Sequence, residues 1–370
     1  MILGELDSII CPAHPEADPV TGAVHSCGHN AQTAALVGIA AALREESVSK
    51  NLCGRIKLCA VPAEELIEIE FRQNLKKEGK IKYLGGKPEF LHRGYFDSSD
   101  IAIVVHTSYT AYVSVGAVGC ITKEVVYKGK ASHAGGAPWD GRNALYAATC
   151  GIGAVNAIRE TFREDDIIRV HPIITNGGAM VNAIPETVRL ESYVRGAGFE
   201  GIDEANRKVN RALTGAALSM GTNVEIIDTF GYAPMKSDRN MIDVACEAAG
   251  EIFPDMPFER SEKIWSASTD MGDLSCVMPT VHPFAGGAVG TPHGMDYQIA
   301  DPASACVNSA CLQLAMINVL LRDGAERAKR VIAEHKPIFE SKKAYFEYID
   351  SFASSGDRIE YSENSAKIKL

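Results

Sequence analysis

The hydrophobic pattern along the chain combines short apolar runs with longer segments rich in Ala and Leu. Residues 2–7 and 55–61 read as strands, and residues 101–105 form the near-continuous apolar run that is typical of a buried parallel strand. Helices are predicted over the Ala-rich apolar segments at about 30–43, 238–252 and 303–322. This alternation predicts an α/β domain with a mostly parallel sheet and covering helices.

The pattern changes near residue 116 and returns to α/β character after residue 232. The elements expected between these points are strands and helices at about 120–127, 141–160, 167–175, 186–195, 202–219 and 223–229. Their order, β-α-β-β-α-β, predicts a ferredoxin-like α+β domain inserted into the α/β domain.

Four parts of the chain follow from this organisation. The expected parts are 1–115 and 233–330 for the catalytic domain, 116–232 for the insert and 331–370 for a peripheral C-terminal extension. Within the first part, the Lys-rich polar stretch 66–95 predicts an exposed excursion. The larger domain is therefore expected to be discontinuous in sequence.

Composition and charge narrow the class of protein. The 370 residues are 46% hydrophobic and 23% charged, which is ordinary for a globular chain with a sizeable core. Lys and Arg number 37 and Asp and Glu 47, and the difference, 37 − 47 = −10, argues against a nucleic-acid-binding surface. We expect no signal peptide, because the first residues lack a basic region before an apolar run. We also expect no membrane span, because we identify no apolar stretch of the required ~18 residues.

The ten cysteines contain no C-x-x-C pair and are irregularly spaced. We therefore predict reduced thiols and a cytoplasmic protein. Cys27-Gly28-His29 is the first candidate for chemistry, because thiolate and imidazole are both ligands of zinc-like metals. The flexible Gly28, in a loop before a helix, would let both side chains turn toward one ion.

Other candidate residues follow predicted strand ends. Glu64 and Glu65 come after the strand that ends near Pro62, where one carboxylate could bind a metal and the other could act as a general base. His106 ends the run 101–105, and His293 follows a glycine-rich loop. A solvated surface, a capping histidine or a turn histidine would explain each one alone. Together with Cys27 and His29 they form a set that a transition metal prefers.

The insert contains a second group of polar residues. His133 lies in a flexible turn after a strand, Asn182 lies in the turn-rich run 177–185, and Arg195 ends a strand. A turn or a surface salt bridge would account for each. In a functional site, the Arg fork suits a substrate carboxylate, and a histidine could polarise a carbonyl oxygen.

A series of motifs in a fixed order points to a known family. The motifs are E-L-D, H-S-C-G-H-N, P-A-E-E, V-V-H, A-S-H-A-G-G-A-P, G-G-A-M-V-N-A-I-P-E, Y-V-R-G, S-T-D-M-G-D and G-T-P-H. They run from residue 5 to about 301. In this order the chain resembles the aminoacylase and metallocarboxypeptidase family of metal-dependent amidohydrolases. The resemblance is closest to the subgroup of aminobenzoyl-glutamate hydrolases and auxin-conjugate (N-acyl-amino-acid) hydrolases.

The resemblance implies a role for each site residue. The residues at the subgroup's metal-ligand positions are Cys27, His29, Glu65, His106 and His293. Glu64 falls at the general base, and Asp7 matches a carboxylate that supports the metal site. His133 matches a histidine of the dimerisation domain that reaches the active site of a second protomer, and Asn182 and Arg195 fall at substrate-binding positions. One or two divalent ions, Zn²⁺ or Mn²⁺, and a homodimer are implied.

Four features depart from the family's pattern. The sequence begins almost at Asp7, whereas relatives carry a helix and a strand before this position. Glu5 stands where other branches have a metal-binding histidine, which leaves the number of ions open. Asn30 replaces an Asp often seen after C-G-H, as it does in the aminobenzoyl-glutamate branch. The excursion 66–95 is longer than expected from typical relatives.

The prediction is hydrolysis of a linear amide bond by a metal-activated water and a Glu base. The expected substrate is an N-acyl amino acid, an aminobenzoyl-glutamate-like conjugate or a small dipeptide, with no nucleic acid or membrane as partner. One alternative is a catalytically inactive family member that acts as a binding or structural protein. A second is cysteine-based hydrolysis through Cys27 and a histidine.

Overall fold

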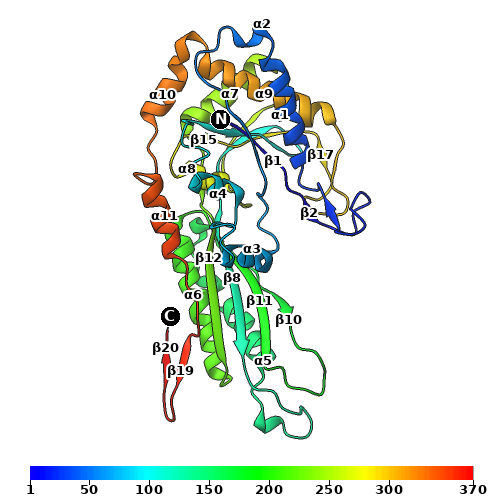
Figure 1. Ribbon diagram of the computed structural model, residues 1–370, viewed down its shortest axis with the longest axis vertical. Coiled ribbons are helices and arrows are strands. Elements are labelled where there is room, and N and C mark those ends of the chain that lie inside the picture. The colour runs from blue at the N-terminus through cyan, green and yellow to red at the C-terminus, as the bar shows by residue number, and fades with distance from the viewer. Residues whose placement is uncertain (370) are drawn as a thin grey trace. The chain divides into compact units, whose positions relative to one another are not determined.

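The computed structural model describes residues 1–369, and its contacts divide the chain into two compact units (Figure 1). The first unit contains Met1–Ala117 and Met235–Lys342. The second contains Val118–Pro234 and the chain from Lys343 on. The chain crosses between the units three times, and the first two crossings lie within two residues of the boundaries expected from the sequence. Each unit is described by itself.

A parallel sheet lies at the centre of the first unit. Its strands, in spatial order, are β15 (Thr280–Val281), β5 (Ala102–Val104), β1 (Ile2–Glu5) and β4 (Leu58–Val61). Every neighbouring pair is parallel, and β1 and β5 are buried throughout, as the apolar runs predict. The carboxyl ends of β1, β4 and β5 therefore share one edge, from which the chain continues to Asp7, Glu64 and His106.

A second sheet extends the first unit beyond this edge. Its strands are β13 (Met235–Lys236), β7 (Tyr112–Ala117), β16 (Pro283–Ala285) and β6 (His106–Thr107), and β14 (Glu259–Trp265) pairs with β7. Two small antiparallel pairs complete the unit. They are β2 (Ile9–Ile10) with β3 (Ala23–Val24) and β17 (Ala288–Val289) with β18 (Gln298–Ile299).

Three long helices build the core around the parallel sheet, as the apolar segments predict. They are α1 (His29–Leu43), α7 (Arg239–Ile252) and α9 (Ser309–Leu321), and shorter helices are α2 (Glu46–Ser49), α8 (Met271–Ser275) and α10 (Glu326–Glu334). A π-helical stretch continues α9 backwards, so that residues 303–321 form a helix long and apolar enough to cross a membrane. The expectation that no stretch has this length is wrong. More than half of the helix is buried in the protein, as in a core helix.

The excursion at 66–95 is only partly exposed, which corrects the sequence-based expectation. It forms α3 (Ile69–Lys77), with exposed residues such as Phe71, and α4 (Gly86–His92). All residues from Tyr83 to Glu89 are buried, including Lys87. The Lys-rich composition did not reveal this burial because the buried ammonium group is paired with carboxylates from distant parts of the chain.

The second unit has the ferredoxin-like arrangement that the element order predicts. Its sheet has the order β10 (Ile173–Asn176), β11 (Thr187–Gly196), β8 (Gly119–Lys128), β12 (Asn223–Tyr232), and the short β9 (Arg169–Val170) pairs with β11. These pairs are antiparallel, and helices α5 (Ala144–Ala157) and α6 (Phe199–Ser219) share an apolar core with the sheet. The fold class expected from the sequence is confirmed.

Strand β8 is almost entirely buried, although its alternating pattern predicted a half-buried strand. Its polar residue Lys123 is buried because the ammonium group forms an ion pair with Asp228 of β12 and donates to Asn210 Oδ1 at 2.6 Å. Asn206 and Asn210 of α6 donate to the other oxygen of Asp228, at 2.9 and 2.7 Å. These hydrogen bonds and the ion pair compensate the buried charges of Lys123 and Asp228. The residue pattern of one strand cannot reveal them, because the partners lie on other elements.

From Lys343 on, the C-terminal segment belongs to the second unit, whereas the peripheral extension was expected to begin at residue 331. It forms α11 (Lys342–Ser351), β19 (Ile359–Tyr361) and β20 (Ala366–Ile368). Rings of this segment pack on the insert, with Tyr348 at 5.2 Å from Phe199 and Phe352 at 5.5 Å from Phe230. The segment's charged composition hid these aromatic contacts.

Candidate metal centre

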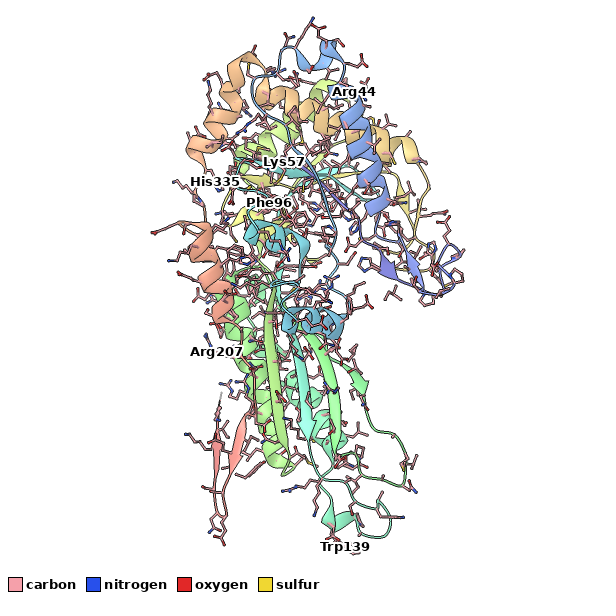
Figure 2. All side chains as sticks on the ribbon, in the orientation of Figure 1. Arg44, Lys57, Phe96, Trp139, Arg207 and His335 are labelled. Atoms are coloured by element: carbon pink, nitrogen blue, oxygen red, sulfur yellow. The ribbon has the colours of Figure 1, made fainter. Side chains whose placement is uncertain are left out.

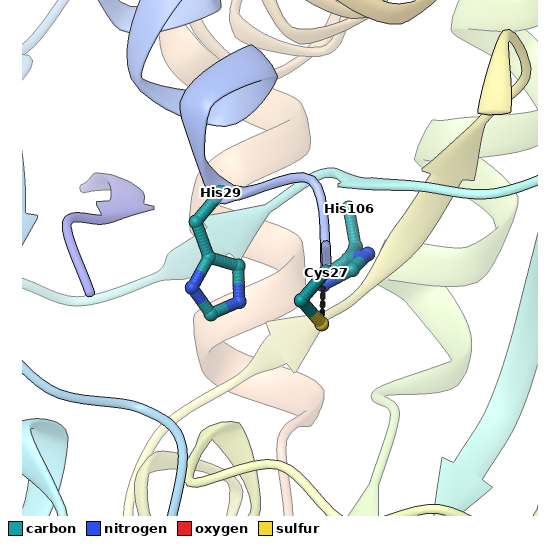
Figure 3. A group of neighbouring side chains, drawn as sticks. All are labelled: Cys27, His29 and His106. Atoms are coloured by element: carbon teal, nitrogen blue, oxygen red, sulfur yellow. Dashed lines mark hydrogen bonds between the residues drawn. The ribbon is translucent and has the colours of Figure 1, made fainter. Parts of the chain in front are cut away.

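The five predicted ligands gather around Cys27 at the carboxyl edge of the parallel sheet. Figure 3 shows three of them, Cys27, His29 and His106. The Cys27 Sγ lies 3.6 Å from His106 Nε2 and 3.3 Å from His293 Nε2. His293 Nε2 in turn lies 3.1 Å from Glu65 Oε1, and the rings of His29 and His106 meet edge to face at 5.5 Å. The structure therefore brings together side chains separated by up to 266 positions in sequence.

Hydrogen bonds on the outer side of two imidazoles turn their Nε2 atoms inward. His106 Nδ1 donates to the Thr107 carbonyl oxygen at 2.8 Å, and His29 Nδ1 donates to the carbonyl oxygen and Oδ1 of Asp7 at 3.0 and 3.1 Å. Since Nδ1 carries the proton, Nε2 of each neutral ring presents a lone pair to the centre. His29 Nε2 is buried and lies 3.2 Å from Glu5 Oε2.

Asp7 fixes both the ligand His29 and the turn that carries the two glutamates. Its Oδ2 accepts hydrogen bonds from the backbone N–H groups of Glu64 and Glu65, at 2.7 and 2.8 Å. Its Oδ1 faces His29. One carboxylate thus couples the loop after β1 to the turn after β4, a geometry that suits a residue supporting a metal site.

Unusual backbone conformations position two of the candidate ligands. Gly28, at the N-terminus of α1, has φ 93°, a conformation that glycine adopts without strain and that lets the side chains of Cys27 and His29 approach each other. His293 has φ 64°, a left-handed conformation that is uncommon outside glycine, and its N–H donates to Ser26 O at 2.9 Å. Non-glycine residues held this way occur often at functional sites.

The several buried carboxylates of the centre favour the binding of a cation. Burial and the charges of Glu65 and Glu64 raise the pKa of the Cys27 thiol well above its usual value. Burial and the charges of Glu5 and Glu65 also raise the pKa of Glu64. Burial lowers the pKa of His29, but the Glu5 charge, with Asp7 and Glu64, outweighs it and raises this pKa to about 10. A divalent ion would offset the same excess of negative charge.

The donor atoms form groups that could hold metal ions. Atoms of Cys27, His29 and His106 lie within 4.8 Å of one another, as do those of Cys27, Glu65 and His293. The two groups share Cys27, so the set could hold one or two ions. Glu5, His29 and Glu64 form a third such group. Among the described residues, these groups include all five expected ligands.

Sequence reasoning missed a buried ion-pair cluster directly beside the centre. Lys87 is fully buried, and its ammonium group contacts Glu5 Oε1 at 2.5 Å and Asp270 Oδ1. Glu5 also lies 3.2 Å from His29 through its Oε2. Burial raises the pKa of Glu5, but the charges of Lys87 and His29 outweigh it and hold this pKa well below its usual range. The G-G-K sequence at 85–87 was the only local signal.

The second unit holds the three remaining site residues, and it does not bring all of them together. His133 and Asn182 are exposed neighbours, because Ala134 N donates to Asn182 O at 2.9 Å and His133 pairs with Ala183. Arg195 pairs with Cys120, at the end of β11 opposite to Thr187. Arg195 is eight positions after Thr187, which corresponds to about 26 Å along a strand.

The tautomer of His133 follows from its hydrogen bonds. Its Nδ1 accepts from the backbone N–H groups of Gly135 and Gly136, at 3.2 and 2.9 Å. In the neutral ring the proton is therefore on Nε2, which can donate outward. Arg195 Nε is buried and forms no hydrogen bond in the part of the chain that the structure describes, and its guanidinium lies 5.2 Å from the Tyr193 ring.

Comparisons with known proteins show what this chain is similar to. The model of the family described as Peptidase family M20/M25/M40 matches residues 4–316. The chain is 30% identical over 279 residues to the Xaa-Arg dipeptidase of Mus musculus, covering 73% of this chain and 59% of that protein. It is 30% identical over 212 residues to one of the subunits of p-aminobenzoyl-glutamate hydrolase from Escherichia coli (strain K12), covering 55% of this chain and 43% of that protein.

A solved structure shows the same fold. The crystal structure of a dinuclear metal-binding peptidase of the M20 family from Bacillus subtilis matches with a TM-score of 0.62 at 18% identity. The match covers 86% of this chain and 80% of that one. The chain spans less than two thirds of the length of the two curated relatives. The family model covers most of the chain, which confirms the resemblance seen in the motifs: the chain belongs to Peptidase family M20/M25/M40.

Proposed function

We propose that this protein is a metal-dependent hydrolase that cleaves the amide bond of an N-acyl amino acid, an aminobenzoyl-glutamate-like conjugate or a small dipeptide. The observation that carries the proposal is the convergence of two thiol- and imidazole-containing ligand groups on Cys27, beside the buried carboxyl of Glu64. The names of the relatives, a dipeptidase and an aminobenzoyl-glutamate hydrolase, support the same substrate class.

In this proposal, residues of the first unit bind the metal and transfer the proton. The residues that would hold one or two ions of Zn²⁺ or Mn²⁺ are Cys27, His29, Glu65, His106 and His293. When bound, the metal supplies a Lewis acid that polarises the scissile carbonyl and acidifies the attacking water. The Glu64 carboxylate takes the proton from that water and delivers it to the leaving amine nitrogen.

The residues of the second unit bind and orient the substrate. Arg195 and Asn182 hold the carboxylate of the amino-acid half, for which the guanidinium fork is suited. His133 donates from Nε2 to the oxyanion that develops on the carbonyl oxygen. His133 and Asn182 lie at the end of β11 opposite to Arg195, which supports a homodimer in which the second protomer provides His133.

The surface of the second unit supports the dimer. Strand β10 is the edge of its sheet, and Ile173 and Ile174 on this strand are 60% and 40% exposed. Val181 is 99% exposed and Trp139, at a loop tip, is 77% exposed (Figure 2). An uncovered edge strand beside exposed apolar side chains is a favourable surface for pairing with a second copy.

The environment of Cys27 argues against the cysteine-based alternative. Two histidines lie within 3.6 Å of the Cys27 thiol, as a nucleophilic pair would require. Burial and two carboxylates raise the pKa of this thiol, however, whereas nucleophilic cysteines have a lowered pKa. A thiolate held by metal resolves this conflict. Because such a ligand is sensitive to oxidation and all ten cysteines are free, a reducing cytoplasm is the compartment we propose.

The decisive experiment combines metal analysis with a substrate panel. The purified protein should contain at least one equivalent of Zn²⁺ or Mn²⁺ and hydrolyse some N-acyl amino acids or dipeptides. Activity should disappear after thorough chelation and return with Zn²⁺ or Mn²⁺. A folded protein that binds no metal and hydrolyses no acyl substrate would instead support the inactive, binding or structural role. Activity that survives chelation but is lost after thiol alkylation would support the cysteine mechanism.

A further inference from the structure

A buried ammonium group lies at the carboxylate-rich side of the metal centre. Lys87 of α4 is 0% exposed, and its Nζ contacts Glu5 Oε1 at 2.5 Å and Asp270 Oδ1. The backbone N–H of Lys87 also donates to Asp270 Oδ2 at 2.9 Å. Both carboxylates are themselves fully buried. Three segments of the first unit thus meet at one fixed positive charge.

The same ammonium engages a carboxylate that could otherwise bind metal. Atoms of Glu5, His29 and Glu64 lie within 4.8 Å of one another, close enough to hold an ion. Yet Glu5 Oε1 is occupied by Lys87, and Glu5 Oε2 accepts from Gln32 Nε2 at 2.7 Å. A metal at Glu5 would have to displace these donors or lie within a few ångströms of the ammonium charge, where two cations repel strongly in a buried site.

Close backbone packing holds Lys87 in this place. Gly86 N donates to Ala63 O at 2.7 Å, so the segment that carries Lys87 lies directly against the turn that carries Glu64. A Cβ at Gly86 would collide with the Ala63 backbone and with a Val61 methyl group 2.6 Å away. The ammonium is therefore placed by main-chain contacts as well as by its own flexible side chain.

We propose that Lys87 is a built-in cation that takes the place of a metal ion at Glu5. In this arrangement the metal ions are confined to the two groups that share Cys27, and Glu5 orients Lys87 without binding metal. The inference rests on the proposed function, because it states which residues of the proposed metal centre bind metal and which do not. It makes Lys87 and Asp270 positioning residues of the site.

Counting bound Mn²⁺ tests this proposal without reference to turnover. Metal-free protein is dialysed against Mn²⁺, and bound equivalents are measured by mass spectrometry for the wild type and for Lys87→Ala. Alanine removes the ammonium and leaves space between two buried carboxylates. We expect Lys87→Ala to bind one equivalent more than the wild type. Lys77→Ala, on α3 and outside the cluster, is the matched control and should bind the wild-type number.

Two further variants decide the outcome even if Lys87→Ala folds poorly. The double variant Lys87→Ala/Glu5→Gln keeps the net charge of the cluster and should return to the wild-type number. Glu5→Gln alone leaves Lys87 paired with Asp270 and should also bind the wild-type number. An unchanged count in Lys87→Ala, or the loss of one equivalent in Glu5→Gln, would overturn the proposal.

The same measurement separates the two claims. A wild-type protein that binds no Mn²⁺, together with a gain of one equivalent in Lys87→Ala, would contradict the proposed function and still support the role of Lys87. A wild type that binds Mn²⁺, with no gain in Lys87→Ala, would leave the proposed function intact and remove the built-in cation.

Discussion

Two adjacent carboxyl groups at the metal centre have opposite electrostatic environments. Burial and the charges of Glu5 and Glu65 raise the pKa of Glu64. Burial also raises the pKa of Glu65, but the hydrogen bond and charge of His293 outweigh it and lower this pKa. When the pKa values of two neighbouring carboxyl groups differ in this way, commonly one group transfers protons while the other stays ionised. This difference supports the proposed roles of Glu64 as the proton carrier and Glu65 as a charged metal ligand.

Glu64→Gln should separate catalysis from metal binding. The amide keeps the size of the side chain but cannot accept the proton of the attacking water. We expect unchanged metal content and a loss of at least ~10²-fold in kcat, the usual scale for a general base. Glu70→Gln, exposed on α3, serves as the control and should retain the wild-type kcat. An unchanged kcat in Glu64→Gln would remove this residue from the mechanism.

In the second unit, the buried Asp228 predicts a sensitivity to acid. Burial raises the pKa of Asp228, but the Lys123 charge and hydrogen bonds from Asn210 and Asn206 outweigh it and lower this pKa. The folded state thus binds fewer protons than the unfolded state. The stabilisation is present above the unfolded pKa of about 4 and is lost as the pH falls through the lower folded value.

Denaturant unfolding of Asp228→Asn at several pH values checks this sign. At pH 7 the variant should lose about 3–5 kcal/mol of unfolding free energy, because Lys123 is left buried without its ion-pair partner. Below about pH 5 its unfolding free energy should fall less steeply than that of the wild type. Parallel curves for the two proteins between about pH 5 and pH 3 would contradict the assignment.

At the scale of elements, the spacing of apolar residues predicted the helices and strands whose burial repeats regularly along the chain. The apolar run 101–105, the buried helices and the β-α-β-β-α-β order of the insert all appear in the structure. The errors lie where distant partners decide burial. Lys87 and Lys123 are buried because carboxylates from other segments neutralise them, and the charged C-terminal segment packs through Tyr348 and Phe352. One stretch of sequence does not contain these partners.

Part of the candidate site could also be predicted from the sequence. Each of the five ligands lies near the end of a regular element, and the parallel sheet brings several of these ends to one edge. The spacing of Cys27 and His29 made them candidates, but that spacing is a weak signal until the other three residues are considered with it. The cluster of Glu5, Lys87 and Asp270 could not, because its members are separated by up to 265 positions and only the fold places them together.

Gly86→Ala tests the contact between α4 and the catalytic turn. The added Cβ would meet the Ala63 backbone, so the turn that carries Glu64 must shift. We expect a loss of about 1–3 kcal/mol in unfolding free energy and of ~10-fold or more in kcat. Gly250→Ala, in α7 with open space around it, should not reduce either quantity. Wild-type stability and kcat in Gly86→Ala would show that this contact does not position the site.

At the scale of the whole molecule, the chain consists of two units with separate cores. The proposed metal ligands all belong to the first unit, whereas His133 and Asn182 lie on the second, at the end of β11 opposite to Arg195. In the proposed homodimer, the second protomer provides the His133 side chain to each active site.

Mixing of protomers tests this arrangement. Glu64→Gln and His133→Ala homodimers should each be nearly inactive. After the two variants exchange protomers, about half of the dimers are mixed, and one site in each mixed dimer has both residues. We expect about a quarter of the wild-type activity to return. No recovery, with mixed dimers demonstrated by native mass spectrometry, would show that His133 acts within its own chain or does not take part.

The central claim is a metal centre built on Cys27, and X-ray absorption spectroscopy of the Zn²⁺-loaded protein tests it most directly. We predict a sulfur scatterer at about 2.3 Å from the metal, together with nitrogen or oxygen ligands at about 2.0–2.2 Å. The sulfur signal should disappear in Cys27→Ser and persist in Cys311→Ser, which removes a thiol on α9. Bound zinc without a sulfur ligand in the wild-type protein would contradict the account.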